Sequence, residues 1–276
     1  MAKLKPGILS DLNGSIGEVT FVASPVGTIA KQKVPAHNSS HSYAQMLRRV
    51  QLRNIQNLFG CLKGSLIPCF ENRLPGVADY HEFVRANYGI VPAYLTKEEA
   101  FAKGCVAVGY QVSRGALPEI GHSIGTGDVP VTNISLGGLT LGPATTVKEF
   151  SDAVCDNNDQ FMNGDRISCF RCNQTVNQAS GVPYVRLVAE EVALDRSDGE
   201  TLLYDICSAL CFSTVDGNIG AREAVSGAIC WVHSRMDEEK LRVSTQRLVT
   251  TNPLQARYQG AEQLESAIQS YGGASN

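Results

Sequence analysis

From residue 113 onward, the sequence is a succession of short strand patterns separated by glycine- and proline-rich turns. Runs rich in apolar and β-branched residues, bounded by turn residues, are typical of strands in β-rich proteins. We expect strands at 131–136, 166–172, 182–194, 201–208, 224–234 and 240–250. The last two are expected to be joined by a polar hairpin loop over 236–239. Short strands linked in this way favour an Ig-like sandwich or small barrel.

The region before these strands has the periodicity of helices. From Ser42 to Phe59, apolar residues recur every three or four positions, which predicts an amphipathic helix. The stripe continues to Phe70, and Gly60, Gly64 and Pro68 are expected to bend or interrupt that second half. Shorter elements are expected as helices over 79–87 and 261–271, helices after the capping boxes Thr96–Glu99 and Thr146–Glu149, and a strand over 105–112.

The first 35 residues are rich in glycine and predict a β hairpin. Residues 16–22 form one strand pattern, 24–27 a turn and 28–34 the returning strand. The sequence therefore predicts an α+β fold in three parts. These are an N-terminal β arm or hairpin (1–35), a helical region (36–112), and a β-rich domain with a short C-terminal helix (113–276).

Composition excludes several classes of function. Hydrophobic residues make up 43% of the 276 residues and charged residues 18%, which is typical of a globular protein. The net charge of -3 and the lack of a polybasic run argue against direct nucleic-acid binding. The sequence contains neither an apolar stretch of membrane-spanning length nor the apolar core of a signal peptide at its start. We therefore expect that the protein is made in the cytoplasm and does not associate with a membrane.

The nine cysteines are odd in number and lie mostly in apolar runs, which favours free buried thiols in a reducing compartment. One alternative is a zinc site made by Cys169, Cys172, Cys207 and Cys211, since four thiolates can coordinate zinc tetrahedrally. The strand pattern around the first pair and the apolar flanks of the second favour buried thiols instead.

Other chemical motifs are weaker. The segment Gly121-His122-Ser123-Ile124-Gly125 has the Gly-x-Ser-x-Gly spacing, but a strand pattern follows it, whereas a nucleophile elbow leads into a helix. Three further groups could suggest a ligand site, but each has a simpler explanation. His37 and His41 are expected in a solvated loop, and the glycines from Gly121 to Gly127 in a turn before a strand. The acidic group Asp152, Asp156 and Asp159 is expected at the polar end of a helix. Tyr184 and Trp231 have strand spacing and predict packing rather than a base-stacking surface. We expect no catalytic, cofactor-binding or metal-binding residues, hence no cofactor and no enzyme.

Three segments carry a resemblance to a known family. They are Leu4 to Leu9 followed by Gly14, Gly17 and Val19, the helix pattern 42–70, and residues 227–229 with 241–246. They resemble a family of small uncharacterised proteins from Bacteroidetes genomes and phage-like mobile DNA. That family has Gly-Gly after Gly-Ile-Leu, where this chain has Ser10-Asp11. The resemblance implies a virion component of crAss-like tailed phages, and it offers no catalytic residue to carry over.

We therefore expect a non-enzymatic structural or assembly subunit of a tailed-phage virion, with a tail or connector component favoured over a capsid-surface component. Its partners would be further copies of itself and other virion proteins. The arm over 7–34 would add a strand to a neighbour, because an exposed sheet edge pairs readily. The alternative is a cytoplasmic module that binds a small ligand or peptide at 121–142.

Overall fold

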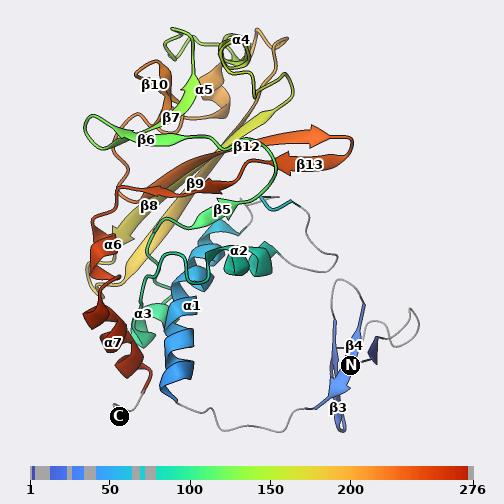
Figure 1. The fold of residues 1–276 in the computed structure, drawn as a ribbon, viewed down its shortest axis with the longest axis vertical. Helices are drawn as coiled ribbons and strands as arrows, with labels where there is room; N and C mark the ends of the chain where they lie inside the picture. Colours follow the sequence, from blue (N-terminus) through green and yellow to red (C-terminus); the bar gives the residue numbers. More distant parts are fainter. Residues whose placement is uncertain are drawn as a thin grey trace.

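The fold is that of a computed structural model, which describes residues 2–3, 13–23, 27–33, 42–63, 69–71 and 79–272. It has the predicted α+β organisation, with an N-terminal sheet, a helical middle and a β-rich C-terminal half (Figure 1). The β-rich half contains several sheets, and none of the sheets in the described residues closes into a barrel.

The N-terminal arm is a larger sheet than the predicted hairpin. Its four antiparallel strands have the order β1-β4-β3-β2: β1 (Ala2–Lys3), β2 (Gly14–Ile16), β3 (Val19–Val22) and β4 (Ile29–Gln32). A two-residue turn joins β2 to β3, and Gly17 adopts a φ of 56° there, which favours glycine. Most of the predicted turn at 24–27 lies outside the described residues.

A long antiparallel sheet divides the rest of the molecule. Its order is β13-β12-β8-β9, with β15 also paired to β12: β8 (Arg166–Val176), β9 (Pro183–Ala193), β12 (Ala228–Asp237), β13 (Lys240–Val243) and β15 (Val249–Thr250). Successive side chains of a strand point to opposite faces, so each face supplies its own core. On β8, Cys169 belongs to one core and Phe170 to the other.

Helices cover one face of this sheet, which we call the helix face. They are α1 (Tyr43–Leu62), α2 (Asp79–Asn87), α3 (Lys97–Phe101), α6 (Leu254–Arg257) and α7 (Ala261–Ser270) (Figure 1). The apolar stripe of α1 contributes Val50, Leu58 and Leu62 to the core that also contains Phe170 and Val232 of the sheet. The predicted helices over 42–59, 79–87 and 261–271 are confirmed, and α1 continues through Gly60.

The opposite face packs against a second, smaller sheet and two helices. That sheet has the order β10-β11-β7-β6: β6 (His122–Gly125), β7 (Val129–Ser135), β10 (Ser213–Val215) and β11 (Asn218–Gly220). The helices are α4 (Val147–Asn157) and α5 (Leu203–Ile206). Ile134 and Ile219 of the small sheet share a core with Ile167 and Trp231 of the long one, as the two sheets of a sandwich do.

Four predicted strands differ from the structure. The turn at Gly17 and Glu18 divides the strand predicted over 16–22, and the one predicted over 240–250 is divided into β13, β14 (Gln246–Arg247) and β15. Residues 105–110 are not a strand, and β5 (Gln111–Ser113) pairs only at the end of that range with β14. Side chains take the place of a neighbouring strand here, because the amide NH of Val106 donates to Asn54 and that of Ala107 donates to Gln174. Residues 201–208 contain α5, which places Leu203 and Cys207 one helical turn apart against the core.

Candidate functional site

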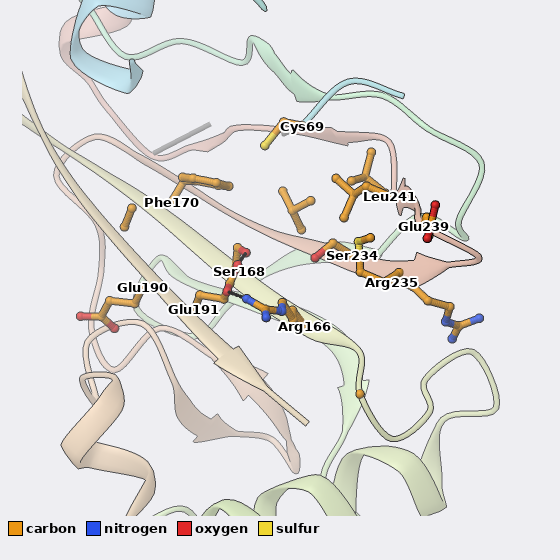
Figure 2. Close-up of a pocket in the computed structure, with 15 residues that line it drawn as sticks. Cys69, Arg166, Ser168, Phe170, Glu190, Glu191, Ser234, Arg235, Glu239 and Leu241 are labelled. Carbon is orange, nitrogen blue, oxygen red and sulfur yellow. Dashed lines mark hydrogen bonds and ion pairs between the residues drawn. The ribbon is translucent and has the colours of Figure 1, made fainter. Parts of the chain in front are cut away.

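The helix face of the long sheet is open toward the β12–β13 hairpin. A cavity of about 570 Å³ lies there, floored by side chains of four neighbouring strands and bordered by Cys69 (Figure 2). We call this surface the open face, and its lining includes Arg166, Ser168, Ala189, Glu191, Ser234, Met236 and Leu241. The strand register brings these side chains to the same face, because Ser168 lies opposite Glu191 and Met236 lies opposite Leu241.

The polar side chains of the open face satisfy one another. The Arg166 Nη1 atom lies 2.5 Å from the Glu191 Oε1 atom, and the Ser168 hydroxyl donates to Glu191 Oε2 over 3.0 Å (Figure 2). Both members of the ion pair are about half exposed, so it contributes roughly 0–1 kcal/mol to stability. Ser168 bonds the Glu191 carboxylate directly, with no histidine between them.

The remaining lining of the open face combines apolar side chains with the polar Glu190, Ser234, Arg235 and Glu239. Phe170 and Val232 form its floor, while Leu241 and the half-exposed Met236 lie toward the hairpin. Apolar walls with a few polar groups, in a volume of this order, are typical of small-molecule binding sites and active sites alike. The alternation of residues in β8 predicts which side chains share this face. The sequence does not show that this part of the sheet would line a cavity.

A histidine–carboxylate pair lies on the other side of the sheet, and the sequence did not predict it. The His233 Nε2 atom is 2.8 Å from Asp165 Oδ2, and Arg235 donates to both oxygens of Asp165 over 2.7 Å. Desolvation by burial raises the pKa of Asp165, but the hydrogen bonds from Arg235 and His233 outweigh it and bring the pKa down to about 2. The residues are 68 positions apart, so no local motif connects them.

This pair has the chemistry of a catalytic dyad but not the access. His233 is fully buried and Asp165 is 1% exposed, so a substrate cannot reach the imidazole. The ring of Phe161 packs on His233 with 4.3 Å between ring centres. The pair therefore joins β12 to the segment before β8 and acts as a structural element.

The four-thiolate zinc alternative is wrong for this fold. Cys169 and Cys172 are three residues apart on one strand, so their side chains enter different cores on opposite faces of the sheet. Cys207 and Cys211 lie on the same side as Cys169. Burial raises the pKa of both β8 thiols, which opposes the thiolate that zinc requires. Within the described residues, no group of three or more histidine, cysteine or acidic side chains could hold a metal.

The remaining sequence candidates have structural roles or fall outside the described residues. Gly121 to Gly127 belong to the β6–β7 hairpin, and none of residues 121–142 lines the cavity. Asp152 and Asp156 pair with Arg196 over 2.7 and 2.9 Å, which contradicts a calcium loop. Trp231 is fully buried, as predicted, and donates to the Cys211 carbonyl. His37 and His41 lie outside the described residues.

Comparison with known proteins adds no relative. No protein-family model, no curated protein and no solved structure matches this chain. In the part of the chain that the structure describes, no helix is both long and apolar enough to cross a membrane.

Proposed function

We propose that this chain is a non-enzymatic assembly subunit that associates through its N-terminal sheet. The observation that carries this proposal is an apolar face on that sheet with exposed side chains, against which no helix or strand of the described residues packs extensively. The register places Ile16 opposite Val19 and Phe21 opposite Ala30, so these four side chains share one face. Ile16 is 65% exposed and Val19 is 39% exposed.

The sheet stands apart from the body of the protein. In Figure 1 it lies beside the helices, and among the described residues its strands pack extensively only against one another. A small sheet needs a covered hydrophobic face for independent stability. Burying a side chain such as Ile16 would contribute about 1–2 kcal/mol. The sheet thus has both the surface and the energetic reason to dock on another subunit.

The class of assembly follows from the resemblance of the N-terminal segment, helix and closing hairpin. We place the subunit in a tailed-phage virion, made in the host cytoplasm, as a tail or connector component. The partners are further copies of this chain and other virion proteins. The strands β1 and β2 are the edges of the arm and would pair with a neighbour's strand.

Light scattering after size exclusion, over a concentration series, tests this proposal. The full chain should give a mass that is a multiple of 29.7 kDa. Ile16→Lys should return the monomer, because it places a charge on the apolar face. Ser15→Lys is the matched control, since Ser15 is the next residue of the same strand and points to the opposite face.

Deleting residues 1–35 should likewise abolish assembly and leave the circular dichroism of the body unchanged. A full chain that stays at 29.7 kDa throughout the series would contradict self-association. Equal behaviour of the Ile16 and Ser15 variants would exclude the apolar face as the contact.

The cavity on the open face supports a second candidate, a module that binds a small ligand or peptide. Its volume of about 570 Å³ lies in the range of ligand sites. This candidate predicts a stable monomer and saturable binding in a thermal-shift screen. Ala189→Trp should abolish each hit, because Ala189 is an exposed residue of the cavity wall and tryptophan would fill it. Hits that persist in Ala189→Trp would place the ligand elsewhere.

A further inference from the structure

Two thiols meet between α1 and the segment that follows α3. The Sγ atoms of Cys61 and Cys105 lie 3.6 Å apart, although the residues are 44 positions apart in the sequence. Cys61 belongs to the last turn of α1 and is partly exposed, whereas Cys105 is fully buried. The pair therefore has one thiol that a small reagent can reach and one directly behind it.

The backbone on both sides of this contact is held in place. One turn before Cys61, the Asn57 side chain donates to the carbonyls of Ala100 and Gly104, over 3.1 and 2.7 Å. The amide NH of Cys105 donates to the Pro183 carbonyl over 2.8 Å. These contacts join α1 to the Cys105 segment, so the two sulfur atoms stay neighbours without any covalent bond.

The two thiols differ in acidity. The hydrogen bond with Cys105 lowers the pKa of Cys61 to about 7, against the opposing effect of burial. The same hydrogen bond and burial raise the pKa of Cys105. The negative charge of a thiolate is more stable on Cys61, because water reaches that sulfur. The Cys105 thiol then donates its hydrogen bond to the Cys61 thiolate. A thiolate is the reactive form of cysteine, so Cys61 is the nucleophile of the pair.

We propose that Cys61 and Cys105 are an oxidation site that forms an intramolecular disulfide when the protein meets a peroxide. The Cys61 thiolate attacks one oxygen of hydrogen peroxide, the O–O bond breaks, and Cys61 becomes a sulfenic acid as one water is released. Cys105 then attacks the Cys61 sulfur, the S–S bond forms and the second water leaves. Two thiols lose two electrons and two protons, and one peroxide becomes two waters.

The sulfur atoms must approach by about 1.5 Å to reach the bond length of a disulfide. The disulfide would link the end of α1 to the segment that follows α3 and close a loop over residues 61–105. This inference does not depend on the assembly proposal, since both thiols lie in the body of the protein.

Intact mass spectrometry of the full chain tests the site. The reduced protein is treated with hydrogen peroxide, then unfolded and alkylated with N-ethylmaleimide. Nine cysteines less two leaves seven, so the oxidised protein should carry seven adducts and the untreated protein nine. Peptide mapping without reductant should find the peptides of Cys61 and Cys105 linked, and dithiothreitol should restore nine adducts.

Variants distinguish this pair from general oxidation. Cys61→Ser and Cys105→Ala should each abolish the link, whereas Cys155→Ser should retain it, since Cys155 is also partly exposed. Nine adducts after peroxide treatment of the wild type would overturn the proposal. A link from Cys61 to Cys172, whose pKa the Cys61 charge raises, would also overturn it. The wild-type map decides even if a variant fails to fold.

Discussion

Replacing Asp165 with asparagine should destabilise the protein strongly although the side chain keeps its shape. The carboxylate accepts four hydrogen bonds, two from Arg235, one from His233 and one from the amide NH of Met162. The asparagine NH₂ group must replace one oxygen, so it would face a donor. At the Oδ1 position this donor is the Nε–H of Arg235.

The magnitude follows from two estimates. The pKa of Asp165 falls from 3.8 to about 2 on folding, a shift that corresponds to about 2.4 kcal/mol in favour of the charged form. The asparagine NH₂ group would leave a buried donor without an acceptor, which costs about 1–3 kcal/mol more. The sum is about 3–5 kcal/mol, the range for breaking a buried ion pair by removing one partner.

Urea unfolding at pH 7 measures this loss through the fluorescence of Trp231, the single tryptophan, which is buried. Asp152→Asn is the matched control, because Asp152 pairs with Lys148 and Arg196 at the surface. The control should lose much less than Asp165→Asn, because exposed ion pairs contribute little to stability. If Asp165→Asn itself loses less than about 1 kcal/mol, the reasoning about the buried cluster is refuted.

The pH dependence gives an independent check on Asp165. Its folded pKa is lower than its unfolded pKa, so its contribution is complete above about pH 4 and disappears as the pH falls through about 2. The difference in stability between the wild type and Asp165→Asn should therefore shrink between pH 4 and pH 2. A difference that stays constant over this interval would exclude the carboxylate charge as its origin.

Three further predictions concern other parts of the fold. Gly227→Ala should cost at least about 2 kcal/mol in urea unfolding, because its Cβ would lie 1.9 Å from a carbonyl oxygen of β8, whereas Gly142→Ala meets open space and should change little. Thr146→Ala should lower the unfolding free energy by about 1 kcal/mol, since it removes the cap that Thr146 and Glu149 form on α4. Burial lowers the pKa of His122 to about 4, so the unfolded chain binds a proton that the folded chain does not, and stability should fall from about pH 6.5 to 4. His122→Phe should flatten that interval in acid titrations followed by circular dichroism, and an unchanged slope would contradict the assignment.

Local features of the sequence predicted local structure well. The helix over 79–87 has the predicted bounds, and both capping boxes form, since a cap depends on residues three positions apart. The predicted hairpin is confirmed, but its loop is shorter than 236–239: Glu238 and Glu239 form the turn with positive φ, whereas Met236 and Asp237 belong to β12. These elements need only information that neighbouring residues contain.

The errors occur where distant residues replace the expected partner. Residues 105–110 have a strand pattern, but Asn54 and Gln174 accept their backbone NH groups. Residues 201–208 have an apolar pattern that a strand and a short helix share, and packing selected the helix. The zinc alternative failed because spacing alone does not show which face of a strand each thiol occupies.

The sequence by itself determined the α+β class, the order of most elements and the amphipathic stripe of α1, because periodicity and turn residues act over short distances. Only the tertiary structure decided how each face of the long sheet is used. Among the described residues, it packed helices on one face and a second sheet on the other, and it left a cavity at the open face. It also brought Asp165 to His233 and Cys61 to Cys105. Such contacts depend on the register and packing of segments far apart in the chain, which no local pattern specifies.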